Sequence, residues 1–356
     1  MTLTARFSPL PELAALGPRW RALEARGQGS FFLGWTWTGA WLSAYGVRPE
    51  LLAVTDGGED VGLALVGHAM QPRLLGRAAT LLIGQSGDPS ADRPFIEYNG
   101  LLTAIDRTVP ATTAAMAAID RRRDWRVLKL AGVEPDSALL NLPARRRSLL
   151  DTSPAYMVDL ATVRGTGGDY LSLLGGNTRS QIRRAMKDRG GALPVASTPA
   201  DDGEAAEWIA QMHALNSGRH QDNAWDDAGF RQFVQALVRD GRDNGEVELL
   251  RFADAGGLVG LLVNFRYRGR AMNYQSAFVQ PTGAKDKPGL LCHAAAVARY
   301  ADAGMAHYSL LAGKDRYKES LSTCQESLEW WALERFAPRL EAEALLRRLL
   351  RARPHS

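Results

Sequence analysis

The fold of this chain is decided by the stretch Val247-Glu-Leu-Leu-Arg-Phe-Ala-Asp254, Ala255-Gly-Gly257 and Leu258-Val-Gly-Leu-Leu-Val-Asn-Phe-Arg-Tyr267. The outer segments are rich in apolar and β-branched residues, and the glycines between them are typical of a hairpin turn. Arg268-Gly-Arg270 then turns the chain into Ala271-Met-Asn-Tyr-Gln-Ser-Ala-Phe-Val279. The sequence therefore predicts a meander of antiparallel strands over residues 247–279.

A polar loop, Gln280-Pro-Thr-Gly-Ala-Lys-Asp-Lys-Pro-Gly289, leads into a helix predicted from about Leu290 to Asp302. The first turn of a helix carries unpaired N–H groups and a positive dipole, so Lys285 and Lys287 beside it suit a phosphate or pyrophosphate. Pro288 is tolerated in a first turn, and Gly289 lets a ligand approach the backbone. We predict a phosphate-binding segment at residues 285–290. The alternative is an ordinary solvated loop with two surface lysines.

The same hairpin pattern occurs earlier in the chain. Residues 50–66 align without a gap onto residues 248–264, at a constant offset of 198 positions. The identical pairs are Glu50/Glu248, Leu51/Leu249, Leu52/Leu250, Asp56/Asp254, Gly58/Gly256, Val61/Val259, Gly62/Gly260 and Leu63/Leu261. Unrelated hairpins share turn glycines and apolar strands, but the shared Glu and Asp favour two copies of one α/β unit. No lysine-rich loop precedes the helix predicted near residues 110–121, so we expect the first copy to have lost cofactor binding.

The order of elements after residue 246 resembles the acyl-CoA-binding half of a GNAT acyltransferase. The meander, loop and helix are followed by a strand at residues 306–312, a helix from Asp315 and a last strand at residues 327–334. Gly313-Lys-Asp-Arg-Tyr-Lys318 resembles the glycine-then-Tyr-Lys signature of the Fem-like and CelD-like branch. With the repeat, the resemblance implies an α/β (α+β) fold of two tandem GNAT-like units, each a mixed, mostly antiparallel sheet flanked by helices. We expect domains at 1–150 and 151–335, and a basic amphipathic helix at 336–356.

The resemblance also implies the chemistry. In a GNAT-type transfer an amine attacks the thioester of acetyl-CoA or a longer acyl-CoA directly. The resemblance places the carbonyl-polarising backbone and part of the cofactor site at Tyr274, Gln275 and Ser276, and it gives Tyr317 the role of acid for the departing thiolate. A packed aromatic residue at a helix start is the alternative for Tyr317. Lys318, as in the Fem-like signature, is expected to stabilise developing negative charge.

The base that takes the proton from the amine has several candidates. His220 has a suitable unperturbed pKa, Glu97 needs a raised pKa, and His307 lies on a predicted strand. A water chain is a further route. Glu97 also forms a polar pair with Asn99, which suits the amine or hydroxyls of an acceptor or, equally, a cap for the following helix.

A basic helix is predicted at residues 177–187. Arg179, Arg183 and Lys187 share one of its faces, which suits an anionic acceptor such as a phosphorylated lipid carrier. A solvated helix face is an equal alternative. Arg219, in the loop after the next predicted helix, is a further candidate for binding the acceptor.

Composition excludes several function classes. A net charge of +4 without a dense basic run among aromatics does not fit nucleic-acid binding. The two cysteines, Cys292 and Cys324, fall in segments predicted as helical and exclude a disulfide framework. Cys292 and His293 are adjacent on a helix and do not face each other, so they are not a nucleophilic pair. His213 and His220 lack partners with zinc spacing, and we expect no metal.

The sequence also carries expectations about location. It has no apolar leader segment and no apolar run of membrane-spanning length, so we expect a soluble cytoplasmic protein. The tail from Leu340 to Arg351 is amphipathic, with leucines on one face and arginines on the other. We expect a helix docked on the body of the protein, with weak contact to the inner face of the membrane as the lesser alternative.

Two function classes follow. The first is an acyl-CoA-dependent N-acyltransferase that acts on an amino group of a cell-envelope or exopolysaccharide precursor, with a long-chain lipid amine as the rival acceptor. An aminoacyl-tRNA-dependent Fem ligase fits less well, since such proteins often carry a coiled-coil insertion that this sequence lacks. The second class is a non-catalytic binding or assembly protein that kept the fold. Tyr317 and the loop at 285–289 favour the enzyme, because a scaffold needs neither.

Overall fold

The computed structural model describes residues 3–219 and 222–351, and it divides into two compact units. Unit 1 comprises residues 1–42, 46–152 and 328–356, and unit 2 comprises residues 43–45 and 153–327. The chain passes between the units within two strands, β8 (Arg146–Asp159) and β14 (Cys324–Glu334).

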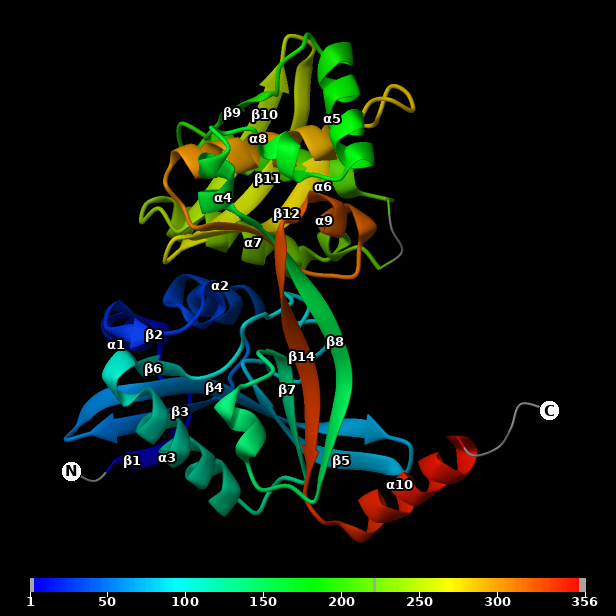
Figure 1. The fold of residues 1–356 in the computed structure, drawn as a ribbon. Coiled ribbons are helices and arrows are strands. Elements are labelled where there is room, and N and C mark those ends of the chain that lie inside the picture. Colours follow the sequence, from blue (N-terminus) through cyan, green and yellow to red (C-terminus); the bar gives the residue numbers. More distant parts are fainter. Residues whose placement is uncertain (1–2, 220–221, 352–356) are drawn as a thin grey trace. The chain divides into compact units, whose positions relative to one another are not determined.

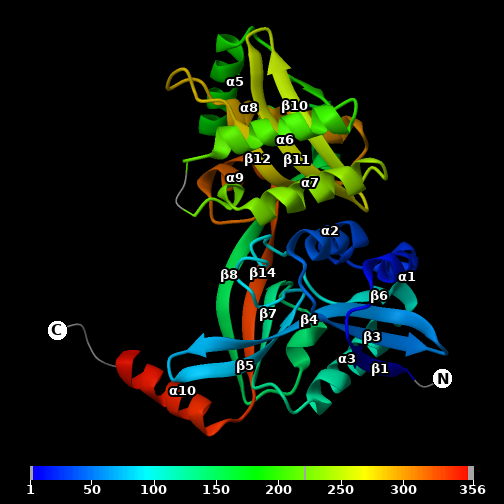
Figure 2. The same ribbon diagram turned by 180° about the vertical axis from the view of Figure 1, so that it is seen from behind.

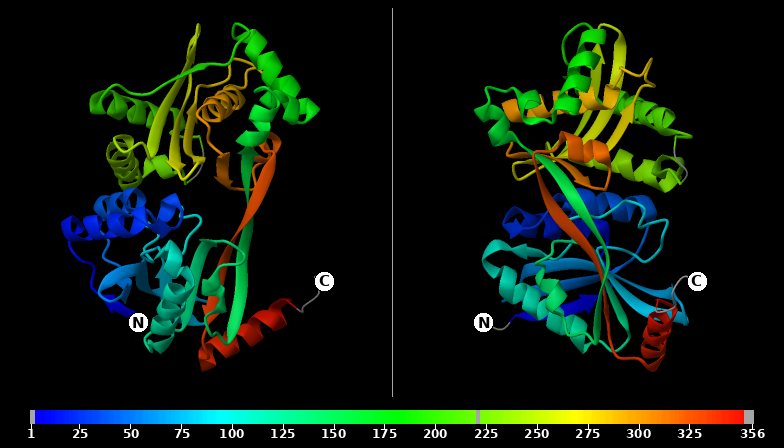
Figure 3. Two further views of the ribbon diagram at one scale, coloured as in Figure 1. Left: turned by 60° about the vertical axis from the view of Figure 1, so that its left-hand side comes forward. Right: turned by 45° about the vertical axis from the view of Figure 1, so that its right-hand side comes forward.

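Unit 2 is a mixed sheet with helices on both faces. Its further strands are β9 (Val195–Ser197), β10 (Val247–Asp254), β11 (Gly257–Tyr267), β12 (Arg270–Phe278) and β13 (His307–Ala312). Its helices are α4 (Leu160–Gly165), α5 (Gly176–Asp188), α6 (Asp202–Asn216), α7 (Ala228–Arg242), α8 (Pro288–Asp302) and α9 (Arg316–Leu321). The strand order is β8-β13-β12-β11-β10-β9. α6 and α7 cover one face of the sheet and α8 the other (Figures 1 and 3).

Unit 1 repeats this plan. Its strands are β1 (Thr4–Ser8), β2 (Gly27–Gln28), β3 (Glu50–Asp56), β4 (Glu59–Arg73), β5 (Gly76–Ile83), β6 (Leu102–Ala104) and β7 (Val127–Val133). Its helices are α1 (Leu13–Ala25), α2 (Trp35–Tyr45), α3 (Thr108–Arg121) and α10 (Pro338–Arg351). The main sheet has the order β1-β3-β4-β5-β7-β14 (Figure 2). The predicted fold class of two tandem units is confirmed.

The two hairpins of the sequence repeat have one register. Glu50 lies opposite Val66, and Glu248 lies opposite Asn264. Each hairpin has an irregularity at the same place, after Val54 in the first and after Phe252 in the second. The positions 54 and 252 differ by the same 198 residues as the aligned sequences. The repeat therefore describes a common backbone, and not only a common composition.

The last strand of each sheet departs from sequence order. β14 pairs with β7 in unit 1, with Glu334 opposite Val127, and β8 pairs with β13 in unit 2, with Asp159 opposite His307. Residues 328–334 therefore belong to unit 1, which corrects the expected domain boundary at 335. Cys324 begins β14 and is not helical. Local sequence does not distinguish the two pairings, because either strand can supply the N–H and C=O groups that either sheet edge needs.

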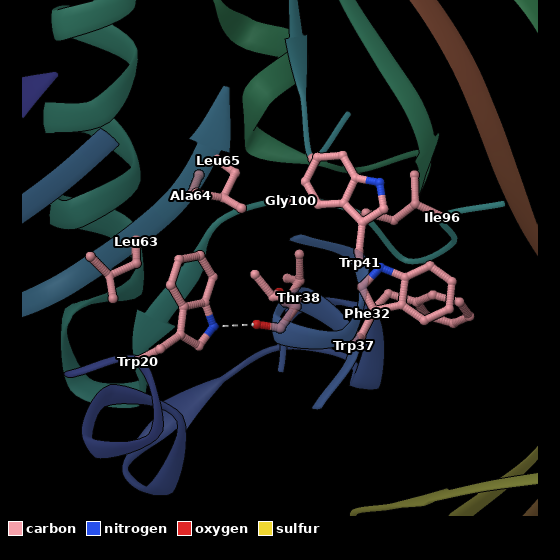
Figure 4. Close-up of a pocket in the computed structure, with 12 residues that line it drawn as sticks. Trp20, Phe32, Trp37, Thr38, Trp41, Leu63, Ala64, Leu65, Ile96 and Gly100 are labelled. Atoms are coloured by element: carbon pink, nitrogen blue, oxygen red, sulfur yellow. Dashed lines mark hydrogen bonds between the residues drawn. The ribbon is translucent and has the colours of Figure 1, made fainter. Parts of the chain in front are cut away.

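The aromatic side chains of α2 are part of the core of unit 1. Trp37 and Trp41 are 3% and 5% exposed, and Trp20 lines the same small hollow (Figure 4). The indole N–H groups of Trp20 and Trp41 donate to the carbonyls of Leu33 and Ala91 at 2.8 and 2.7 Å. The hollow between these rings measures about 20 Å³, enough for one water molecule and too small for a ligand.

Candidate active site

In unit 2 the parallel strands β12 and β13 pair over only part of their length. The last paired residues are Met272 and Ser309. β12 also carries an extra residue, Tyr274, between Asn273 and Gln275, where its pairing with β11 shifts. A bulge of this kind bends a strand and ends regular pairing. The second half of β12 therefore diverges from β13.

Ser276 and Phe278 of β12 point their backbone groups away from β11. The N–H of Val279 donates to the carbonyl of Val259 at 3.2 Å. In an antiparallel ladder such bonded residues alternate with residues whose N–H and C=O face the other side. Ser276 and Phe278 hold those alternate positions, so their N–H groups face the diverging β13. The N–H of Ser276 lies in the segment that the sequence predicted to polarise a thioester carbonyl.

Side chains from the segment after α6 hold this strand in place. The contacts are Asn216 Nδ2 to the Ser276 carbonyl at 3.1 Å, Arg219 Nη2 to the Phe278 carbonyl at 2.6 Å, and Trp225 Nε1 to Gln275 Oε1 at 2.9 Å. Arg219 and Gln275 were predicted to bind acceptor and cofactor. In the structure their side chains position β12, so any contact with a ligand would be in addition to this role.

The loop before α8 is anchored by an ion-pair cluster. Arg189 donates to Asp286 at 2.9 Å and to Asp254 at 3.0 Å. Asp286 also accepts the N–H of Thr282 at 3.0 Å. Arg189 is the main reason that the pKa of Asp286 lies below its usual value. The loop conformation that leads into the helix is therefore fixed by side chains that the sequence analysis had not considered.

The first turn of α8 fits an anionic group. Pro288 is in the first turn, and no side chain caps the helix at Lys287. Lys285 is exposed and Lys287 is half-buried. Uncapped N–H groups with the helix dipole and two ammonium groups suit a pyrophosphate. Packing also favours glycine at position 289, because a Cβ there would lie 3.1 Å from the Phe278 ring.

A cluster of rings joins β12, α8, β13 and α9. The centroid of the Tyr317 ring lies 6.0 Å from that of His293, with the planes 23° apart, and the centroids of His293 and Phe278 are 5.8 Å apart. His293 is 1% exposed, and its Nδ1 lies 2.9 Å from the hydroxyl of Tyr308. Among the described residues its Nε2 has no hydrogen-bond partner. Tyr317 therefore lies at the end of a row of rings that begins on β12.

The environment of this cluster sets two protonation states. Burial, helped by the charge of Lys318, lowers the pKa of His293 to about 3, so the ring is neutral at pH 7. Burial, helped by Asp315, raises the pKa of Tyr317 to about 12, so its hydroxyl is protonated. The Tyr317 side chain is still 42% exposed and open to a ligand. A thiol has a pKa of about 8.5, so Tyr317 is better suited to donate a hydrogen bond to a thiolate than to transfer its proton completely.

The spacing between Gly313 and Lys318 has a structural reason. The Nζ of Lys318 donates to the carbonyl of Ala312 at 2.6 Å. A Cβ on Gly313 would lie 2.7 Å from that Nζ. Glycine therefore leaves room for the ammonium group at the end of β13. The predicted role of Lys318 in stabilising developing negative charge stays a prediction.

Unit 1 shows the same divergence, but a third segment fills it. β5 and β7 stop pairing after Leu82 and Lys129. The backbone N–H of Asn99 donates to the carbonyl of Gly132 on β7 at 3.0 Å, and its Nδ2 donates to the carbonyl of Ile83 on β5 at 2.8 Å. We call residues 96–99 the plug. All four are buried.

The plug changes the interpretation of two predicted site residues. Asn99 also accepts the N–H of Gly100 through Oδ1 at 2.8 Å, so both ends of its amide are used within unit 1. The structure gives Asn99 a bridging role in place of the predicted contact with an acceptor or a helix cap. Glu97 is 5% exposed within the same segment. These bonds also provide a physical reason why unit 1 lacks the open strand edge of unit 2.

A family of known proteins matches the part of the chain that carries this geometry. The match covers residues 176–319 and is described as an Acetyltransferase (GNAT) domain. The chain carries a GNAT acetyltransferase domain. The match includes the diverging strands β12 and β13, the start of α8 and Tyr317. The protein is therefore an acyltransferase, and GNAT domains use acyl-CoA as the donor.

Solved structures with the same fold extend over nearly the whole chain. L-PGS from Bacillus licheniformis aligns with a TM-score of 0.55 and 13% identity, over 94% of this chain and 97% of that one. FemX aligns with a TM-score of 0.56 and 11% identity, over 95% and 99%. The C-terminal domain of an Agrobacterium fabrum protein assigned as a lysylphosphatidylglycerol synthetase gives 0.56 and 10%, over 95% and 96%. No curated protein sequence matches the chain. At these identities the likeness shows the fold alone.

Other predicted residues of the GNAT domain lie apart from the ring cluster. Arg179, Arg183 and Lys187 of α5 line one shallow basic hollow, and their role in binding an anionic acceptor stays a prediction. His307 lies at the start of β13, on the paired side of the divergence. His220 lies outside the described residues, so its role as a base stays a prediction too.

Two kinds of feature are absent from the described residues. No group of three or more His, Cys, Asp or Glu residues there is arranged to hold a metal ion. No helix in that part of the chain combines the length and the apolar character needed to cross a membrane. Leu345 and Leu349 of α10 are exposed, and contact of this helix with a membrane surface stays a prediction.

Sequence reasoning missed His293 because it considered this residue only as a partner of Cys292. The sequence did carry one signal for His293: it lies in the first half of the helix that follows the phosphate loop, and that part of α8 packs on β12.

A polar network was missed as well. It runs from Ser276 through Asn273 and Asn264 to Tyr300 and Glu248, in bonds of 2.6–3.0 Å. It holds the bulged part of β12 to the neighbouring strands and to α8.

Proposed function

We propose that this GNAT domain takes the acyl group of acetyl-CoA or a longer acyl-CoA and transfers it to an amino group of a cell-envelope or exopolysaccharide precursor. The supporting observation is the contrast between the two diverging strand pairs. Asn99 bridges the strands of unit 1. Among the described residues of unit 2 no side chain bridges β12 and β13 in this way, and the rings of Phe278 and His293 link β12 to Tyr317.

In this proposal the amine nitrogen attacks the thioester carbon, so that a C–N bond forms and the C–S bond breaks. The N–H of Ser276 donates to the carbonyl oxygen while negative charge develops there. The hydroxyl of Tyr317 donates to the departing sulfur. The amine loses its proton to His307, to His220 or to a water chain.

The donor is held in this proposal by its pyrophosphate at the first turn of α8. The double variant Lys285→Ala with Lys287→Ala should weaken CoA binding at low salt, and the difference from the unchanged protein should shrink at high salt, because salt screens exposed charges. Calorimetric titration of the full chain with CoA measures this. The matched control is Arg121→Ala with Arg123→Ala, which removes the same charge from an exposed segment of unit 1. Equal affinity of the lysine variant and the control would remove the loop from the site.

A long-chain lipid amine is the second candidate acceptor. It is favoured by the exposed leucines of α10, Leu345, Leu346, Leu349 and Leu350, which suit a lipid-facing surface. Release of CoA measured with an amino sugar and with a long-chain amine, at the same acyl-CoA concentration, separates the candidates. Faster turnover of the long-chain amine would replace the polysaccharide precursor in the proposal. No release with either amine would favour a binding protein over an enzyme of this specificity.

A further inference from the structure

A second hollow lies on unit 1. Its volume is about 370 Å³, and residues of β4, β5, β7, β8 and β14 and of the segment that joins β5 to β6 line it. This volume is in the range of pockets that hold small molecules. We call it the aromatic groove. The residues that decide its chemistry are Gln71, Asp92, Phe95, Lys129, Trp330 and Trp331.

One side of the aromatic groove is a pair of rings. Phe95 is 56% exposed, and its centroid lies 5.6 Å from that of Trp330, with the planes 41° apart. Trp331 also lines the groove, and its indole N–H donates to Oε2 of Glu329 at 2.7 Å. Large aromatic surface left in water is unfavourable unless a ligand covers it. The rings therefore offer an exposed apolar surface.

The other side of the groove is polar and holds both donors and acceptors. The ammonium group of Lys129 donates to Oε1 of Gln71, and each of these side chains keeps N–H groups beyond this bond. The carboxylate of Asp92 is held by Ser86 at 2.7 and 2.8 Å and by Gly87 at 2.8 Å. A carboxylate has more acceptor sites than these bonds use. Burial, and to a smaller extent Arg73, lowers the pKa of Lys129, which fits a group placed to bind a ligand.

We propose that the aromatic groove binds a sugar ring, with the C–H face of the ring on Phe95 and Trp330 and its hydroxyls on Gln71, Lys129 and Asp92. A sugar hydroxyl both donates and accepts, so it matches a mixed set of amide, ammonium and carboxylate groups. A purely apolar ligand would leave these polar groups unpaired, which costs binding free energy. A free phosphate would be repelled by the carboxylate of Asp92, because both groups are negatively charged.

This inference deepens the proposed function and rests on it only for the class of acceptor. A polysaccharide precursor offers such rings next to the amine that would be acylated. Binding of the glycan to unit 1 is a separate event from acyl transfer in unit 2, and each is measured without the other.

The experiment is saturation-transfer NMR of the full chain with two probes, tri-N-acetylchitotriose and cellotriose, and no acyl donor. At least one probe should show transfer to ring protons. Phe95→Ala should weaken its affinity about tenfold or more, equivalent to about 1.4 kcal/mol. The matched control is Phe336→Ala, which removes an aromatic ring that is 65% exposed and outside the groove, and it should change nothing.

A second variant guards against misfolding as the cause of any loss. Gln71→Ala changes a half-buried amide without removing a ring and should also weaken the probe, while thermal unfolding of both variants stays close to that of the unchanged protein. The proposal fails if neither trisaccharide binds, or if Phe95→Ala binds as the unchanged protein does. If a probe binds through Phe95 but CoA does not bind to unit 2, the groove stands and the proposed acyl transfer falls.

Discussion

In unit 1, β5 and β7 stop pairing at Leu82 and Lys129, and in unit 2, β12 and β13 stop pairing at Met272 and Ser309. The backbone therefore diverges at the same point in both copies. Asn99 then bridges the strands of unit 1, whereas in unit 2 the N–H groups of Ser276 and Phe278 face β13. The two copies therefore share the diverging strand pair and differ in whether a third segment fills it.

The residues that are identical between the copies hold the scaffold together. Glu50 pairs with Arg122 at 2.6 Å and Glu248 with Arg299 at 3.1 Å, in each case an arginine at the end of the following helix. Asp56 pairs with Arg107 at 3.4 Å and Asp254 with Arg189 at 3.0 Å. These pairs fix each hairpin to its neighbours, and in unit 2 Arg189 also anchors the loop before α8 through Asp286. The identities between the copies therefore mark architecture.

The residues that differ mark the chemistry. A Cβ on Gly62 would lie 3.4 Å from Ala111 of α3, and a Cβ on Gly260 would lie 3.0 Å from Cys292 of α8, so these two helix positions correspond. The next residues are Thr112 in unit 1 and His293 in unit 2. The ring cluster at the open strand pair therefore has no counterpart in unit 1 at this position.

The largest expected effect tests whether the open copy is the catalytic one. Tyr317→Phe should lower the turnover number roughly 10²–10⁴-fold, the span for loss of one acid or one donor to developing charge. CoA affinity should stay the same, because the phenyl ring keeps its packing on His293. Steady-state kinetics and calorimetry measure the two quantities. Full activity in Tyr317→Phe would show that Tyr317 is a packing aromatic residue without a catalytic role. Tyr267→Phe, at the end of β11, is the control for the removal of a hydroxyl.

The second prediction concerns the pH dependence of stability. In the folded protein the pKa of His293 is about 3, below its unfolded value of about 6.5. Between these values the unfolded chain binds the extra proton, so the stability that the neutral His293 contributes is present above pH 6.5 and is lost as the pH falls toward 3. This loss is about 1.4 kcal/mol per pH unit in the free energy of unfolding.

Urea denaturation between pH 7 and pH 4.5 measures that slope. His293→Gln should flatten it, because glutamine does not titrate. Tyr308→Phe keeps the titrating ring and should lower stability by a similar amount at every pH. Lys318 is the charged group that acts on the ring. An unchanged slope in His293→Gln would mean that the imidazole is solvated in solution.

The third prediction tests the plug in the closed copy. Asn99→Ala should lower the free energy of unfolding by about 1–3 kcal/mol, because the carbonyl of Ile83 and the N–H of Gly100 lose their partner. CoA affinity should not change, and one CoA should still bind per protein chain. Asn141→Ala, an exposed asparagine of the same unit, should have little effect. A raised KM for the amine with unaltered stability would restore Asn99 to the acceptor site.

The smallest expected effect compares the two equivalent glutamates. Glu248→Gln should cost about 1–3 kcal/mol, since this carboxylate is nearly buried and accepts from Tyr300 as well as Arg299. Glu50→Gln should cost about 0–1 kcal/mol, because the side chain is 36% exposed. Thermal unfolding of both single variants provides the measurement. Equal losses would show that the two glutamates contribute equally to the free energy of unfolding.

Much of the fold could be predicted from the sequence because it rests on local patterns. The hairpin of residues 247–267, its repeat at residues 50–66 and the helix after Lys287 follow from apolar periodicity, turn glycines and a proline in the first turn. Tyr317 was predicted from a short motif, and in the structure its ring stacks on His293, which in turn contacts Phe278 of β12. These features depend on interactions between residues close together in sequence, so they can be predicted from the sequence itself.

Only the tertiary structure decided which strand completes each sheet and which copy is open. β8 and β14 are both extended, and nothing local selects β13 or β7 as the partner. The role of Asn99 depends on Ile83 and Gly132, which lie 16 and 33 positions away in the chain. The low pKa of His293 likewise arises from burial among residues of β12, β13 and α9. Burial and long-range hydrogen bonds are properties of the packed chain, and they determine what the same local pattern does in each unit.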